Sequence, residues 1–274
     1  MSVPPRPSDP PLRVLRTTLG PVHVADVGVG PAVVALHGVP GSHRDFRWLA
    51  PTLEPDLRVV RPDLPGFGET PWNIFPARHP RDRAGLLVPL LDALEIDRCV
   101  LLGHSLGGAL ALEAAVAAPD RVAGLALVAS SGLRPHRGYR RFRPVLWSRA
   151  LDVPLLGALL RPVLRRAFTV MGFPRSTPTP ALVHTMYCFG ALDFASSSAA
   201  VQALTAPTLV AWTGDDPLIE PDVFRELAEA APSGPRLSFA RGGHNPQKTQ
   251  AIELGEALVP FVREALAPAP QEHV

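Results

Sequence analysis

Short apolar runs alternate with segments of helical periodicity along most of the chain. Seven runs are typical of buried strands, at residues 22–27, 32–36, 57–60, 99–102, 122–129, 208–212 and 236–239. Apolar residues at helical spacing predict helices at 81–94, 106–118 and 248–266. The turn residues at 28–31 predict a hairpin between the first two strands. Strands that alternate with helices indicate an α/β fold class, a mostly parallel central sheet flanked by helices.

Residues 133–204 break this alternation. They contain no clear strand, they carry bulky apolar residues, and nine arginines lie between residues 134 and 166. We therefore expect a helical lid (cap) insertion at 133–204, in a core formed by residues 20–132 and 205–267. Residues 1–19 are expected to form a flexible N-terminal tail, because the first eleven residues include five prolines and no apolar run.

The composition indicates a soluble globular chain with one large domain. The chain has 274 residues, of which 46% are hydrophobic and 19% charged. A formal net charge of +2 gives no reason to expect a nucleic-acid partner. The most apolar long stretch, 145–164, is interrupted by charged residues, so no membrane span is expected. Cys99 and Cys188 lie far apart in the chain, which favours a reduced, cytoplasmic location.

The motif Gly-His-Ser-Leu-Gly-Gly occupies residues 103–108, between a predicted strand and a predicted helix. In this context Gly-x-Ser-x-Gly forms a nucleophile elbow, a sharp turn that holds a serine at an exposed tip. Gly103 and Gly107 lack the Cβ atoms that would collide where the helix turns back on the strand. Ser105 would then lie at a helix N-terminus, which favours developing negative charge. The alternative is a glycine-rich turn with an incidental serine, and the flanking elements weigh against it.

A serine hydroxyl becomes nucleophilic when a histidine, itself oriented by a carboxylate, removes its proton. In this architecture the acid and the histidine follow the serine in the chain, each just after a strand. The loop after 208–212 supplies Asp215 and Asp216, and the loop after 236–239 supplies His244. Alone, His244 would be an ordinary surface histidine. Its place in a Gly-Gly-His sequence after a strand makes it the candidate base.

At this point the chain resembles the α/β-hydrolase superfamily, in its lidded branch of serine hydrolases and esterases, over about residues 20–265. The resemblance implies that the acid is Asp216, four residues after the last large residue of the strand. Asp215 remains the alternative, with a role in capping the turn if it is not the acid.

An oxyanion hole needs two backbone N–H groups aimed at the oxygen that becomes charged. One should come from Leu106, directly after the serine. The sequence His-Gly-Val-Pro at 37–40 looks like the family's oxyanion loop, which implies Val39 N–H as the second donor and a cis Val39–Pro40 peptide bond. Gly38 is the loop glycine, and His37 is expected to form structural hydrogen bonds beneath this loop.

Asp63 begins the sequence Asp-Leu-Pro-Gly-Phe-Gly-Glu-Thr at 63–70, which resembles a structural loop of the family with Thr70 in place of its usual serine. A carboxylate among glycines also suggests a metal or phosphate site. The chain has neither a phosphate-loop sequence nor the paired spacing of zinc ligands, so we interpret Asp63 as structural.

The remaining candidates surround the elbow and the insertion. His104 could be mistaken for the base, but its place inside the elbow favours packing toward the core. The expected substrate pocket includes His104, Trp147, Met186 and Phe189. The arginines of the insertion form either a solvated helical face or a surface that attracts acidic head groups or anionic substrates. The second interpretation predicts weak contact with a membrane surface.

The resemblance implies acyl transfer to water, with Ser105 as nucleophile, His244 as base and Asp216 as the acid that orients it. This chemistry requires no cofactor and no metal. We expect a hydrolase of carboxylic esters with apolar acyl groups, because the expected lid is rich in aromatic residues and methionine. A carbon–carbon bond hydrolase or a cofactor-free perhydrolase would use a similar triad, and a non-catalytic ligand-binding receptor is a more distant alternative. The dehalogenase and epoxide-hydrolase branches have an aspartate at the position of Ser105.

Overall fold

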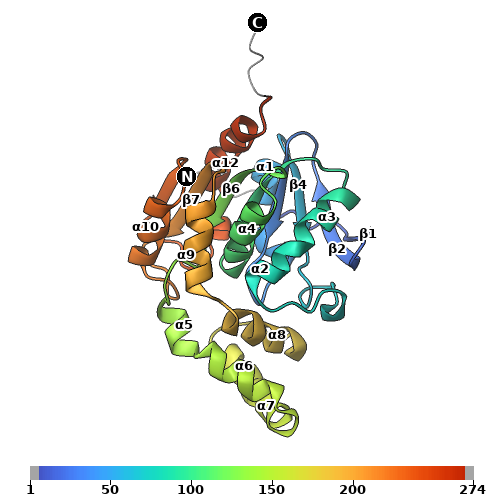
Figure 1. Ribbon diagram of the computed structural model, residues 1–274, viewed down its shortest axis with the longest axis vertical. Coiled ribbons are helices and arrows are strands. Elements are labelled where there is room, and N and C mark those ends of the chain that lie inside the picture. Colours follow the sequence, from blue (N-terminus) through green and yellow to red (C-terminus); the bar gives the residue numbers. More distant parts are fainter. Residues whose placement is uncertain (1–5, 269–274) are drawn as a thin grey trace, which may run out of the picture.

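The computed structural model describes residues 6–268, and one eight-stranded sheet forms its centre (Figure 1). Six of the strands, in the spatial order β4, β3, β5, β6, β7 and β8, pair in parallel with their neighbours. At one edge, β1 pairs antiparallel with β2, and β2 pairs antiparallel with β4. In spatial order the strands are β1 (Arg13–Thr17), β2 (Gly20–Val27), β4 (Arg58–Pro62), β3 (Ala32–Leu36), β5 (Cys99–His104), β6 (Val122–Val128), β7 (Thr208–Thr213) and β8 (Arg236–Phe239). The predicted α/β class with a mostly parallel sheet is confirmed.

Helices cover both faces of the sheet, because the central strands are apolar on both sides. In β3, Val34 and Leu36 pack in one hydrophobic core, and Val33 and Ala35 pack in the other. The first core includes side chains of η3 (Ala84–Leu86), α3 (Leu87–Ala93), α4 (Leu106–Ala117) and α9 (Phe194–Ala203). The second includes side chains of η1 (His43–Phe46), α1 (Ala50–Leu53) and α12 (Ala251–Ala265).

The other short elements lie around the edges of this body. The helix α10 (Pro221–Ala230) packs against β7 in a smaller apolar cluster that contains Trp212 and Phe224. Three more short helices complete the connections, namely η2 (Trp72–Ile74), α2 (Pro80–Arg83) and α11 (Pro246–Thr249).

Between β6 and β7 the chain forms α5 (Arg137–Phe142), α6 (Pro144–Asp152), α7 (Pro154–Val170), α8 (Thr179–Gly190) and α9. The helices α6, α7 and α8 pack around a small core of their own, which contains Leu151, Leu164 and Phe168. In contrast, α9 packs on α4 in the core of the sheet through Ala200 and Val201. The part that stands away from the sheet is therefore α5–α8, called here the helical insertion (Figure 1). Among residues 6–268, no helix has both the length and the apolar character needed to cross a membrane.

Two expectations about the N-terminal half are wrong. The hairpin of 22–27 with 32–36 does not form, since β4 lies between β2 and β3. β3 is buried on both faces and takes parallel neighbours on both edges, which a hairpin partner would exclude. The expected flexible tail also fails at residues 13–17, which form β1, because Leu15 is buried in the core and the strand pairs with β2.

The segment before β1 is also held against the body of the protein, by a hydrogen bond at Ser8. The buried Arg61 donates a hydrogen bond from Nη1 to the carbonyl oxygen of Ser8 at 3.1 Å. Residues 1–5 of the expected tail lie outside the described residues.

The helix expected at 81–94 is divided into α2, η3 and α3, because Pro89 has no N–H to donate to the carbonyl of Gly85 one turn earlier.

The elbow requires glycine because α4 crosses very close to the backbone of β3. A Cβ atom added to Gly107 would lie 2.2 Å from the carbonyl oxygen of Leu36 and 2.4 Å from that of His37. A Cβ atom on Gly103 would lie 2.5 Å from the Cα of Gly108. Neither neighbour is a flexible side chain that could move aside, so these positions accept no larger residue without moving the helix.

We therefore expect Gly107→Ala to destabilise the protein by about 3 kcal/mol, the upper end of the range for an overpacked core. The control is Gly85→Ala, since its added Cβ would meet only Phe75 Cζ at an ordinary 3.4 Å. Urea unfolding followed by circular dichroism measures both variants. Equal stabilities would show that the crossing of α4 over β3 has room for a methyl group.

Candidate active site

Ser105 lies between the end of β5 and the start of α4 in a strained backbone conformation. Its φ of 54° and ψ of −122° lie in a region that residues with a side chain rarely adopt. The backbone on both sides is fixed to the next strand, since Ser105 N–H donates to Val128 O at 3.1 Å and Ser131 N–H donates to Ser105 O at 3.2 Å. These bonds hold the strained turn in place at the N-terminus of α4.

Three side chains that are far apart in the sequence form one hydrogen-bonded chain. His244 Nδ1 lies 2.7 Å from Asp216 Oδ2, and His244 Nε2 lies 2.9 Å from Ser105 Oγ. An ionised carboxylate only accepts hydrogen bonds, so Nδ1 carries a hydrogen and donates a hydrogen bond to Asp216. Nε2 is then unprotonated and accepts the hydrogen bond of the Ser105 hydroxyl. The structure thus brings together the three residues singled out from the sequence.

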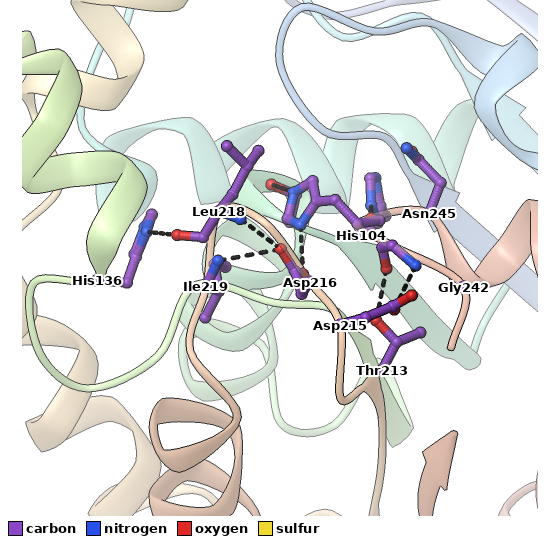
Figure 2. A network of polar contacts seen from close by, with 12 residues as sticks. His104, His136, Thr213, Asp215, Asp216, Leu218, Ile219, Gly242 and Asn245 are labelled. Atoms are coloured by element: carbon purple, nitrogen blue, oxygen red, sulfur yellow. Dashed lines mark hydrogen bonds and ion pairs between the residues drawn. The ribbon is translucent and has the colours of Figure 1, made fainter. Parts of the chain in front are cut away.

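Asp216 is buried beneath this chain and well supplied with donors (Figure 2). Its Oδ1 accepts the backbone N–H groups of Leu218 at 2.8 Å and Ile219 at 3.0 Å. Burial alone would raise the pKa of Asp216, but the hydrogen bond from His244 and these two N–H groups hold the pKa below its usual value. The carboxylate is therefore ionised and fixed in orientation.

Asp215 has a different environment. Figure 2 shows its side chain apart from that of Asp216, beside Thr213. Its Oδ1 accepts the backbone N–H of Gly243 at 2.8 Å, and this bond lowers the pKa of Asp215. The exposed Asp215 joins the loop after β7 to the loop after β8, and it makes no hydrogen bond to the His244 ring.

The loop after β3 lies directly against the elbow. Val39 and Leu106 both line the cavity that contains Ser105, and the Val39–Pro40 peptide bond is cis. As the first residue of α4, Leu106 has no carbonyl one turn earlier to bond its N–H. Among the described residues, Val39 N–H also donates no hydrogen bond. A Cβ atom on Gly38 would lie 3.1 Å from the Ser105 Cβ, so this glycine permits the close approach of loop and serine.

Buried polar groups support this loop from below. His37 Nδ1–H donates to Gly38 O at 2.7 Å, and its Nε2 accepts Leu64 N–H at 3.0 Å. Burial lowers the pKa of His37 to about 4, so the ring is neutral, as its acceptor role requires. Asp63 Oδ1 accepts both the backbone N–H and the ring Nδ1–H of His43. His37 and Asp63 thus each connect the loop after β3 to the loop after β4, and neither faces a reacting group.

His104 is buried beside the triad without belonging to it. Its Nε2–H donates to the backbone carbonyl of His244 at 2.8 Å, and the two rings lie 5.2 Å apart. Burial, reinforced by His244, lowers the pKa of His104 to about 3. A neutral ring committed to the His244 backbone holds the candidate base in position and has no contact with the Ser105 hydroxyl among the hydrogen bonds of the described residues.

A cavity of about 660 Å³ opens onto Ser105 and His244 between the sheet and the helical insertion. Of the four residues expected in the pocket, His104, Met186 and Phe189 line it. Trp147 does not, since it packs against the small core of the helical insertion. The insertion supplies most of the apolar wall, through Phe142, Phe168, Met171, Phe173, Met186 and Phe189.

Three ionisable residues that were not expected in the pocket also line the cavity. Asp45, from the segment that follows the oxyanion loop, has its pKa raised to about 7 by burial. His136 bonds Leu218 O through Nδ1 at 3.1 Å, and burial lowers its pKa to about 4 (Figure 2). Arg141 is exposed and has no hydrogen-bond or ion-pair partner among the described residues. Of these three, only Asp45 has a sequence feature that could have predicted its place in the cavity, namely its closeness to the His-Gly-Val-Pro loop.

Other reactive groups are scarce in the described part of the chain. Residues 6–268 contain no group of three His, Cys, Asp or Glu side chains placed to hold a metal ion. Cys99 and Cys188 are both free and buried. Burial raises the pKa of Cys99 to about 12, so this thiol is not a nucleophile near neutral pH.

Comparisons with known proteins support the same overall fold. The solved structure of a thermophilic esterase from Thermogutta terrifontis is similar with a TM-score of 0.73 and 25% identity, and the match covers 94% of this chain and 100% of that one. A 2-hydroxymuconate semialdehyde hydrolase from Pseudomonas sp. (strain CF600) is 30% identical over 271 residues, 89% of this chain and 91% of that protein. A 2-hydroxy-6-oxo-2,4-heptadienoate hydrolase from Pseudomonas putida is 31% identical over 259 residues, 88% of this chain and 91% of that protein.

A family model described as alpha/beta hydrolase fold matches residues 31–251, which is more than half of the chain. The match includes the oxyanion loop, the elbow and both loops that complete the hydrogen-bonded chain. The resemblance inferred from the motifs is therefore confirmed. The chain belongs to the α/β-hydrolase fold family of enzymes.

Proposed function

We propose that this protein hydrolyses carboxylic esters with apolar acyl groups through an acyl-enzyme on Ser105. The observation that carries the proposal is the hydrogen-bonded chain from Asp216 through His244 to Ser105, at the wall of a largely apolar cavity. A serine in this arrangement can lose its proton as it attacks a carbonyl carbon.

Each residue then has one role in the reaction. His244 Nε2 takes the Ser105 proton as Oγ attacks, and the imidazolium that forms is stabilised by the ionised Asp216. The N–H groups of Val39 and Leu106 stabilise the oxyanion of the tetrahedral intermediate. His244 then gives its proton to the departing alcohol, and a water molecule activated by the same histidine releases the acid. No step requires a metal or a cofactor.

The wall of the cavity supports the choice of an apolar acyl group. Aromatic and methionine side chains of the helical insertion face the cavity, and its volume suits a small or medium-sized organic ligand. We assign the helical insertion the role of a lid that covers Ser105 and excludes bulk water. We also place the protein in the cytoplasm, a proposal supported by two buried, unpaired cysteines.

A second function is favoured by one observation. Arg141 lines the cavity with no carboxylate partner among residues 6–268, although the nearby Arg140 is paired with Glu220. An unpaired guanidinium on the wall of the cavity that contains Ser105 suits a substrate that carries a carboxylate. Two relatives are named as hydrolases of 2-hydroxymuconate semialdehyde and of a 2-hydroxy-6-oxo-dienoate. Carbon–carbon bond hydrolysis of such an acid is therefore the second candidate.

The role of Ser105 is tested by Ser105→Ala. We expect ester turnover to fall by at least about 10³-fold and labelling by a fluorophosphonate probe to disappear, because both need the Oγ nucleophile. Ser198→Ala is the matched control, since that hydroxyl, on α9, donates to the backbone carbonyls of Leu133 and Phe194 and lies outside the hydrogen-bonded chain. Persistent labelling of the Ser105→Ala variant would locate the nucleophile elsewhere.

The assignment of the acid is tested by comparing Asp216→Asn with Asp215→Asn. An amide at 216 would present the wrong donor pattern to His244 Nδ1, and we expect kcat to fall by about 10⁴-fold. Asp215→Asn should stay within about tenfold of the wild type, because the Asp215 carboxylate bonds the loop backbone at Gly243 and not the His244 ring. Steady-state kinetics on one short ester measures both, and the reverse ranking would make Asp215 the acid.

The two candidate functions are separated by a substrate panel. We expect p-nitrophenyl esters of increasing acyl length to be cleaved with a higher kcat/KM than a 2-hydroxy-6-oxo-dienoate. If the dienoate is cleaved faster, carbon–carbon bond hydrolysis replaces ester hydrolysis as the main activity. Arg141→Gln should then raise KM for the dienoate about tenfold or more and leave neutral esters unchanged. Arg143→Gln is the control, since this neighbouring arginine does not line the cavity.

A further inference from the structure

Exposed apolar side chains are concentrated on one part of the molecule. Of the twelve large hydrophobic residues that are exposed among residues 6–268, nine lie between residues 145 and 171, on α6, α7 and the turns beside them. Leu155 is 83% exposed, Val170 80% and Leu159 74%. The nine residues, called here the apolar patch, are Val145, Leu146, Val153, Leu155, Leu156, Leu159, Val163, Val170 and Met171. A patch of this kind on a protein surface indicates a binding face.

The helix α7 is apolar on two opposite sides. Leu164 and Phe168 face the small core of the helical insertion. Leu155, Leu159 and Val163 follow one another at intervals of four residues, so they form a separate stripe on the outer side. A helix that faces only water on its outer side would carry polar residues there. The outer stripe is therefore unexplained by the packing of this chain.

The charge around the patch has one sign. Residues 133–204 contain ten arginines and two aspartates, whereas the rest of the chain contains 17 basic and 23 acidic residues. Within α5–α8 the only acidic residue is Asp152, and Arg78 of the body binds both of its oxygens at 2.7 and 2.8 Å. Arg149, Arg161 and Arg166 are exposed and unpaired among the described residues. Helical spacing puts Arg149 beside Val145 on α6 and Arg166 beside Val163 on α7.

The patch is continuous with the mouth of the cavity. Val170 and Met171 belong to the patch and also line the cavity that contains Ser105. Figure 1 shows α6 and α7 at the end of the molecule remote from α12. A surface that covers α6 and α7 would therefore meet the entrance of the cavity and leave the body free.

We propose that the pair α6–α7 docks on an anionic lipid surface, with the apolar patch inserted among the acyl chains and the unpaired arginines on the head groups. A basic helix with an apolar outer face has the composition that such interfaces select. A second copy of the chain is the less suitable occupant, because two such faces would bring unpaired arginines together with no free carboxylate on either. Docking places the cavity mouth at the lipid surface, and it does not depend on the reaction that Ser105 performs.

The experiment measures vesicle flotation of the full chain. We expect binding to vesicles of phosphatidylcholine with 30% phosphatidylglycerol and much weaker binding to phosphatidylcholine alone. The double variant Leu155→Ser/Leu159→Ser should lower the partition coefficient at least tenfold, because each leucine loses its apolar burial. Arg149→Gln/Arg166→Gln should lower it about 30-fold on anionic vesicles, at about 1 kcal/mol for each arginine.

Matched controls carry the same changes elsewhere. Val14→Ser/Val29→Ser removes two exposed hydrophobic residues outside the patch, and Arg16→Gln/Arg98→Gln removes two exposed arginines that have no partner among residues 6–268. Both controls should bind as the wild type does. All variants should retain the thermal unfolding midpoint of the wild type, since they alter only exposed side chains.

Three results would overturn the proposal: no binding of the wild type to anionic vesicles, equal binding to both vesicles, or wild-type binding by the leucine variant. A dimer in light scattering that dissociates on Leu155→Ser/Leu159→Ser would assign the patch to a second copy instead. Flotation is repeated with Ser105→Ala. Binding without turnover would separate the docking surface from the proposed hydrolase activity, and each can fail alone.

Discussion

The close crossing of α4 over β3 brings Ser105 and the loop after β3 together in the candidate active site. Gly107 brings the helix against the carbonyl oxygens of Leu36 and His37, a distance that no side chain would permit. Because of this crossing, the N-terminus of α4 and the loop after β3 reach the same cavity. Ser105 is then held in its strained conformation by backbone bonds to β6 and the loop after it, rather than by its own preference.

The parallel sheet completes the site from this starting point. The loops after β3, β5, β7 and β8 leave the same edge of the sheet, as the carboxyl ends of parallel strands must. The carboxylate of Asp216 and the ring of His244 therefore meet although 28 residues separate them. Buried histidines at 37 and 104 bond the backbone of these loops as neutral rings, so they add no charge beside Asp216.

The sequence predicted the groups whose placement depends on local motifs. The elbow and the strand ends that carry Asp216 and His244 follow from short patterns within one loop. The cis Val39–Pro40 bond follows from the resemblance of the loop after β3 to the family. Properties that depend on packing between distant segments were not accessible in this way. Trp147 was placed in the pocket from its size alone, but α6 turns it toward the core of the helical insertion. The predicted hairpin failed for the same reason, since the neighbours of β3 come from β4 and β5.

The outer face of α7 shows the same limit from the opposite direction. In the sequence, helical spacing puts Leu155 and Leu159 on the opposite side of the helix from Leu164, and nothing local indicates which side faces the protein. The small core of α6–α8 is filled by residues such as Leu164 and Phe168, which leaves no protein surface for the second stripe. Met171 belongs to the exposed patch and also lines the cavity, so the patch and the cavity meet at this end of α7. The exposed stripe and the open cavity are thus two consequences of one arrangement, in which the helical insertion stands away from the sheet.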